Sequence, residues 1–184
     1  RDEGNDLPRA VRVANLVLRH RAPRSLPGIP GPPARHVSKD GEEGYPGTLT
    51  SKVTYTLTDD NELKWEASAT TDAPTILNLV HHTYWNLSGD PTTSINDHVL
   101  MLAALNYLPT DAGLIPTGEV APVAGTPMDF TKSTVIGDRV EDDFEALKFG
   151  GGYDHNWVLL PHDGLELAAV VCESGTGRNL EVLT

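Results

Sequence analysis

Residues 48–69, TLTSKVTYTLTDDNELKWEASA, decide the fold of this chain. Apolar residues occupy odd-numbered positions on both sides of a polar turn at 59–62: Leu49, Val53, Tyr55 and Leu57 before it, and Leu63, Trp65, Ala67 and Ala69 after it. Because neighbouring side chains of a strand point to opposite faces, a period of two gathers these residues on one face. The stretch therefore predicts an antiparallel β-hairpin with one half-buried face.

Further short runs rich in apolar residues occur along the chain, separated by turn residues such as the Ser-Gly-Asp-Pro of 88–91. We predict further strands at 76–85, 98–103, 156–160, 165–172 and 180–183. No stretch of 12 residues has the apolar spacing of an amphipathic helix. Many short strands with frequent turns are typical of an all-β protein, here an antiparallel β-sandwich or barrel.

The composition narrows the possible partners. The 184 residues include 26 Asp and Glu against 14 Lys and Arg, which gives a formal net charge of −12. Binding nucleic acid requires a clustered cationic surface, so we expect no DNA or RNA partner. With 39% hydrophobic residues, the chain fits one ordinary domain or part of a larger one.

Compartment and membrane contact can also be predicted. Cys172 is the single cysteine, so it cannot form an internal disulfide and nothing requires an oxidising compartment. No window approaches the roughly 18 consecutive apolar residues of a membrane span, and the first residues lack the order of a secretory signal. We expect a cytoplasmic location and no membrane partner.

The first 36 residues differ from the rest. They carry a net charge of +4, from seven Arg against three Asp and Glu, and hold six of the 14 prolines. The proline- and glycine-rich part at 19–35 disfavours both helix and central strand. We therefore divide the chain into an irregular segment, 1–36, for which an artefact of the gene model is one explanation, and a partial β-sandwich domain, 37–184.

The densest cluster of polar and aromatic residues is Asn-Leu-Val-His-His-Thr-Tyr-Trp-Asn-Leu at 78–87. On a strand, His81 and His82 point to opposite faces, so only one can serve a given small site. His82 shares the even-numbered face with Asn78, Tyr84 and Asn86, whereas His81 lies among apolar neighbours. His82 is the candidate for chemistry, although a structural histidine would show the same pattern.

A second cluster, Phe-Gly-Gly-Gly-Tyr-Asp-His-Asn-Trp at 149–157, presents Asp154 and His155 after three glycines. The glycines lack the Gly-Lys-Ser/Thr ending of a nucleotide-binding loop, so Asp154 either binds a ligand or closes a turn. We expect no metal, because the chain has no His-Glu-x-x-His motif and no pair of cysteine ligands.

Five motifs in order give the chain its family resemblance: DGEEGYPG at 40–47, NLVHHTYWNL at 78–87, PTGE at 116–119, GTPMDF at 125–130 and GYDHN at 152–156. Together they resemble the aldose 1-epimerases, or galactose mutarotases, with plant members the nearest in texture. The resemblance runs from about residue 37 to the last residue. It implies a large antiparallel β-sandwich, the supersandwich, of which this chain holds an incomplete part.

The resemblance also implies a reaction. Interconverting the α and β anomers of hexoses such as glucose and galactose needs an acid at the ring oxygen and a base at the anomeric hydroxyl, each contributing roughly 10²–10⁴-fold. It gives His82 the role of general acid and Asp154 that of sugar ligand. A hexose substrate and no cofactor are expected. Neither a preferred hexose nor an oligomeric state is predicted.

Two departures from the family pattern affect the expected activity. The Leu-His-Gly-Gly segment has no counterpart, and the family's catalytic glutamate follows a strand that corresponds to the last residues here. We therefore expect impaired isomerase activity. The alternative is a noncatalytic carbohydrate-binding or interaction module using Tyr84, Trp85 and Asp154. A phosphorylated substrate is disfavoured by the scarcity of Lys and Arg after residue 36.

Overall fold

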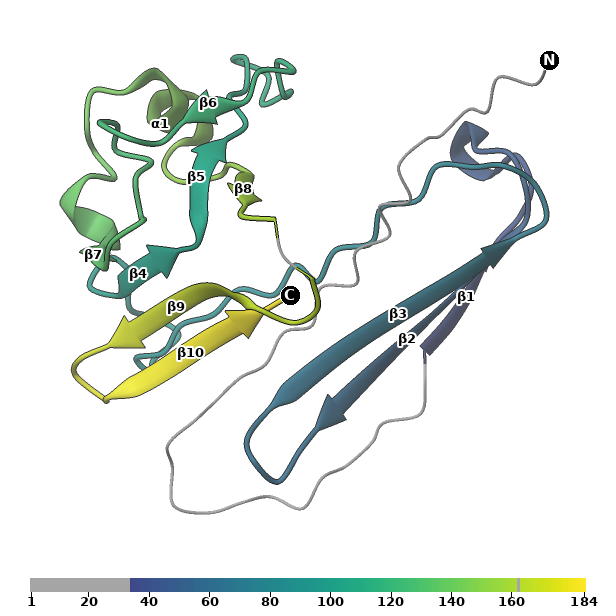
Figure 1. Cartoon of the computed structure of the whole chain (residues 1–184), viewed down its shortest axis with the longest axis horizontal. Helices are drawn as coiled ribbons and strands as arrows, with labels where there is room; N and C mark the ends of the chain where they lie inside the picture. Colours follow the sequence, from purple (N-terminus) through teal and green to yellow (C-terminus); the bar gives the residue numbers. More distant parts are fainter. Residues whose placement is uncertain (1–33, 162) are drawn as a thin grey trace.

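The computed structural model describes residues 34–161 and 163–184, and it confirms the all-β antiparallel class (Figure 1). Its strands form three sheets. The first has the order β1 (Ala34–Ser38), β2 (Leu49–Leu57), β3 (Leu63–Thr71); the second β10 (Arg178–Leu183), β9 (Leu167–Glu173), β4 (Val99–Leu102), β7 (Thr134–Val135); the third β6 (Ala121–Pro122), β5 (Ala104–Tyr107), β8 (Trp157–Leu159). The helices described are η1 (Glu42–Gly44), η2 (Ile136–Asp138) and α1 (Glu145–Gly150).

The predicted hairpin is present as β2 and β3. Their antiparallel register places Leu57 opposite Leu63 and Tyr55 opposite Trp65, so the odd-numbered apolar residues share one face. Asn61 takes a positive φ of 60° in the connecting turn, a backbone conformation that asparagine tolerates better than most residues. In Figure 1 this three-stranded sheet lies apart from the other two.

Strand β1 begins at Ala34, inside the segment predicted to be irregular. Residues 34–38 pair with β2 from Ala34 opposite Val53 to Ser38 opposite Leu49. The backbone of the long strand β2 supplies hydrogen-bond partners here, and this overrides the weak strand signal of a segment that follows several prolines. The rest of the predicted irregular segment, residues 1–33, lies outside the described residues.

Residues 76–85 contradict the prediction of a strand there: they form no helix or strand, and neither do their neighbours at 74–75 and 86. A strand requires a neighbour that offers a row of backbone groups, and alternating side chains alone cannot supply one. The other predicted strands, at 98–103, 156–160, 165–172 and 180–183, correspond to β4, β8, β9 and β10. The short elements β5, β6, β7 and α1 were not predicted.

A hydrophobic core packs the third sheet against α1. Its buried members are Tyr107, Val123, Met128, Ala146 and Leu147, with Ala121, Phe144, Tyr153 and Trp157 packed around them. Phe130, which is 1% exposed, contacts the rings of Tyr153 and Trp157 at 5.0 and 6.1 Å between centroids. This core fixes the place of the 149–157 motif, because Tyr153 and Trp157 belong to both.

Candidate active site

His82 lies on the surface, within the irregular segment 74–86. Its ring is 5.5 Å from that of Tyr84, centroid to centroid, at a tilt of 47°. Tyr84 itself is 89% exposed. An exposed imidazole beside an exposed phenol can meet a polar ligand from solvent, which is the setting that a proton-donating histidine and a sugar-stacking aromatic ring both need.

His81 has the opposite environment. It is half-buried, with its ring 5.5 Å from Tyr55 and 5.9 Å from Trp65, both on the apolar face of the β2–β3 hairpin. Its Nε2 is 2.8 Å from the hydroxyl of Thr83. The predicted separation of the two histidines is therefore present even though the predicted strand is not.

Asp154 follows a turn made by glycine. Helix α1 ends at Gly150, and Gly151 and Gly152 then take positive φ values of 61° and 131°, which an L side chain adopts only at a cost. The Gly152 N–H donates to the carbonyl of Leu147 at 2.9 Å and closes the helix. The glycines thus end α1 and turn the chain so that the Asp154 side chain is exposed.

Two aromatic side chains fix the segment on either side of Asp154. The Tyr153 hydroxyl donates to the carbonyl of Pro127 at 3.1 Å, and the Trp157 indole donates to the carbonyl of Met128 at 3.0 Å. Both acceptors belong to the Gly-Thr-Pro-Met-Asp-Phe motif at 125–130. That motif is held in turn by Arg139, whose Nη2 donates to the carbonyl of Asp129 at 2.6 Å. The carboxylate of Asp154 therefore projects from a rigid base.

His155 lies beside Asp154 but faces the protein. Its ring is 6.1 Å from that of Tyr107, and its Nε2 is buried without a hydrogen-bond partner in the described part of the chain. Burial lowers the pKa of His155, and the neighbouring Asp154 carboxylate opposes that effect in part. His155 is therefore suited to remain neutral beneath the surface on which Asp154 is displayed.

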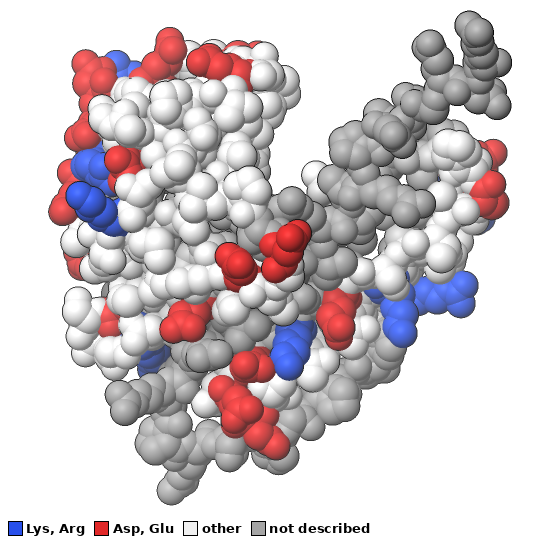
Figure 2. Space-filling view, viewed as in Figure 1, with Lys and Arg blue, Asp and Glu red and all other residues white. Residues whose placement is uncertain are grey.

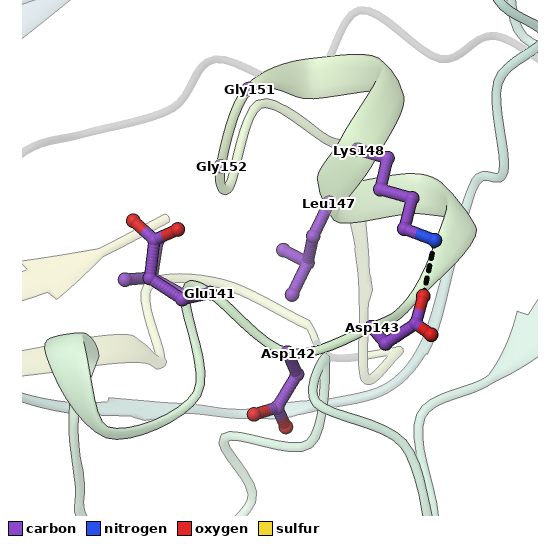
Figure 3. A pocket seen from close by; sticks show the side chains of 8 residues that line it. Glu141, Asp142, Asp143, Leu147, Lys148, Gly151 and Gly152 are labelled. Carbon is purple, nitrogen blue, oxygen red and sulfur yellow. Dashed lines mark ion pairs between the residues drawn. The ribbon is translucent and has the colours of Figure 1, made fainter.

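No hydrogen bond or ion pair joins His82 to Asp154 among the described residues. A depression of about 430 Å³ next to Asp154 is lined by Gly151, Gly152, Leu147, Val140, Lys148 and three acidic residues, Glu141, Asp142 and Asp143 (Figure 3). Lys148 forms an ion pair with Asp143. Acidic side chains gather over this end of the molecule, near α1 (Figure 2). Neither His82 nor Asp154 lines the depression.

Within 34–161 and 163–184, no group of three or more His, Cys, Asp or Glu side chains is placed to hold a metal ion. In the same ranges, no helix has the length and apolar character needed to cross a membrane.

Comparison with known proteins assigns the family. The sequence model of aldose 1-epimerase matches residues 31–184. The chain belongs to the aldose 1-epimerase family. It is 42% identical to human galactose mutarotase over 182 residues, which is 99% of this chain and 50% of that protein. It is 38% identical to the aldose 1-epimerase of Escherichia coli K12 over 80% of this chain and 42% of that protein.

Solved structures of the family share the fold. A crystal structure of galactose 1-epimerase from Lactobacillus acidophilus matches with a TM-score of 0.69 at 32% identity, over 80% of this chain and 44% of that one. A Caenorhabditis elegans aldose epimerase homologue matches with a TM-score of 0.65 at 28% identity, over 91% of this chain and 47% of that one. The chain spans about half the length of the curated relatives it matches.

Proposed function

We propose that this aldose 1-epimerase family chain contributes to the interconversion of the α and β anomers of hexoses such as glucose and galactose. The observation that carries the proposal is the 42% identity to human galactose mutarotase over 99% of this chain. The bacterial relative named aldose 1-epimerase supports the same reaction class. A cytoplasmic location remains our prediction from the single cysteine and the absence of a membrane-spanning run in the sequence.

The reaction requires two proton transfers. An acid delivers a proton to the ring oxygen while a base removes one from the hydroxyl on C1, and the C1–O5 bond breaks to give the open-chain aldehyde. Rotation about the C1–C2 bond turns the other face of the carbonyl toward O5. Reclosure with the reverse proton transfers yields the other anomer, so no oxidant, reductant or cofactor is consumed.

We assign the acid to His82. Its exposed ring can approach the ring oxygen of a sugar, and the aromatic face of Tyr84 beside it offers a surface for the sugar's C–H groups. His81 is unsuited to this role because its ring packs against Trp65 and Tyr55. Asp154 is assigned to sugar binding, where its carboxylate would accept hydrogen bonds from hydroxyl groups.

The test is polarimetry of freshly dissolved α-D-glucose and α-D-galactose with the purified protein. We expect the rotation to reach equilibrium faster than in buffer alone, with an impaired enzymatic rate because no residue is assigned to the base, and we expect His82→Ala to remove most of that acceleration. His36→Ala is the matched control, since His36 is an exposed histidine on β1. A rate equal to that of buffer would contradict the proposal. If calorimetry then showed sugar binding, the noncatalytic carbohydrate-binding module would be favoured instead.

A further inference from the structure

The segment that carries His82, residues 74–86, is followed directly by Leu87, and both backbone groups of Leu87 are held by side chains distant in sequence. The N–H donates to Nε2 of His98 at 2.9 Å. The carbonyl accepts a hydrogen bond from Nη1 of Arg178 at 2.9 Å, and the hydroxyl of Thr176 is 3.1 Å away. Leu87 is thus tied to the residue that precedes β4 and to the β9–β10 hairpin.

Of the two contacts at the carbonyl, the one from Arg178 is the stronger. The Thr176 hydroxyl has a single proton, and it is also 2.6 Å from the carboxylate of Glu173. A charged acceptor at the shorter distance takes that proton in preference to a neutral carbonyl. Arg178 is therefore the main donor to Leu87, and Thr176 chiefly orders the turn that carries Arg178.

His98 is specialised for its contact with Leu87. This residue is 2% exposed. Among the described residues, His98 is the one buried residue of polar or charged type. Because Nε2 accepts the Leu87 proton, a neutral ring carries its own proton on Nδ1. That Nδ1 has no hydrogen-bond partner within the described residues. An apolar side chain would fill the same space without a desolvated nitrogen, so the acceptor at Nε2 is what the position requires.

The other flank of His82 is held by a different sheet. His81, the residue directly before it, packs against Trp65 of β3 and Tyr55 of β2. Figure 1 shows the chain running from β3 past the second sheet, and residues 74–86 have no backbone pairing of their own along this path. His82 therefore lies between an aromatic contact on one sheet and the Leu87 backbone contact on another.

We propose that His98 is a positioning residue for His82, acting through its hydrogen bond to the Leu87 N–H. This inference rests on the proposed function for the role of His82, but not for the hydrogen bond itself. An irregular segment holds a side chain in one place only if its ends are fixed, and proton transfer is sensitive to misplacement of about 1 Å. His98 fixes one of these ends without touching the substrate.

Two substitutions of similar volume separate positioning from packing. In His98→Gln, the side-chain oxygen can take the place of Nε2 and accept the Leu87 proton. In His98→Leu, no acceptor remains. Met128→Ala serves as a control that loosens the core elsewhere, since Met128 is 0% exposed and belongs to the third sheet's core.

The first measurement uses NMR. It records the rate of amide hydrogen exchange at Leu87 and the scalar coupling between the Leu87 amide nitrogen and Nε2 of His98 across the hydrogen bond. We expect the coupling in the wild type, about tenfold faster exchange in His98→Leu, and exchange near the wild-type rate in His98→Gln and Met128→Ala. Absence of the coupling, or equal exchange in the Leu and Gln variants, would overturn the proposal. This measurement needs no enzymatic activity.

The second measurement is the mutarotation rate by polarimetry. We expect His98→Leu to lower kcat about tenfold or more with a smaller change in KM, and His98→Gln to recover most of the loss. If both variants keep the wild-type kcat, His98 does not position His82. If the wild type itself shows no mutarotation, the proposed function fails, while the exchange result still decides whether His98 holds the segment.

Discussion

The imidazole of His81 lies 5.9 Å from the indole of Trp65 between ring centroids, with the two planes 27° apart. Trp65 is 4% exposed, and it stands opposite Tyr55 in the hairpin. The histidine next to the proposed acid is therefore part of the packing of the first sheet. This contact links the hairpin, whose pattern is the clearest in the sequence, to the segment that carries His82.

Replacement of Trp65 by Ala should destabilise the protein by about 3 kcal/mol, because it removes a buried aromatic side chain and leaves a cavity beneath His81. Urea unfolding measures this loss. Tyr84→Ala is the matched control, since Tyr84 is 89% exposed and its removal should change the stability by no more than about 0.5 kcal/mol. Equal losses in the two variants would contradict the packing role of Trp65.

The hairpin could be predicted from sequence because its two strands are neighbours that pair with each other. The alternation of Val53, Tyr55 and Leu57 with polar residues specifies both the faces and the register. Segment 76–85 has a comparable alternation, but among the described residues its backbone pairs with no strand, so the prediction of a strand was wrong. The predicted alternation of side chains is present only in part: Leu77, His81 and Trp85 are half-buried and His82 is exposed, but Leu79 and Thr83 of the odd-numbered face are exposed as well.

Sequence reasoning identified the candidate site residues more readily than the residues whose hydrogen bonds hold the neighbouring backbone. His82 and Asp154 stand out in clusters of unusual composition. His98 and Arg178 contact Leu87 across 11 and 91 positions of the chain, respectively. Such contacts depend on how the sheets come together, and no local pattern encodes them. The one available signal for His98 was a histidine at the start of an apolar run.

Asp154→Ala should weaken sugar binding, since it removes a charged acceptor of hydrogen bonds worth about 1.5–3 kcal/mol, or roughly 10- to 100-fold in affinity. Calorimetric titration with D-galactose measures the change. Asp60→Ala is the control, because Asp60 is an exposed carboxylate in the β2–β3 turn. If both variants bind as the wild type does, Asp154 merely closes the turn after the three glycines.

Gly89→Ala should be more destabilising than an ordinary glycine replacement in a turn. A Cβ at Gly89 would lie 2.5 Å from Nη1 of Arg178, which would displace the guanidinium from the Leu87 carbonyl. With φ at 81°, the new side chain also carries a backbone strain of about 1–2 kcal/mol. In Gly89→Ala, thermal unfolding should show that the free energy of unfolding falls by the strain energy plus about 1–2 kcal/mol more. The additional loss arises because a hydrogen bond from a charged donor is weakened.

Gly118→Ala provides the comparison for Gly89, since Gly118 has a φ of 88° and no atom within 4 Å of an added Cβ. The free energy of unfolding of Gly118→Ala should fall by the backbone strain energy alone. In an Arg178→Met background the excess cost of Gly89→Ala should disappear, because no guanidinium remains to be displaced. An excess that persists in this background would show that Arg178 is not the cause.

The half-buried ring of His155 should make the free energy of unfolding depend on pH. Burial lowers its pKa in the folded state below the ordinary value of 6.5. As the pH falls below about 6.5, the unfolded chain therefore binds more protons at this position than the folded chain, and the free energy of unfolding decreases. His155→Gln removes the titrating group. Urea unfolding between pH 7.5 and 5.5 should show a larger loss of stability in the wild type than in His155→Gln. Parallel losses in the two proteins would mean that the His155 ring takes up its proton equally well in the folded state.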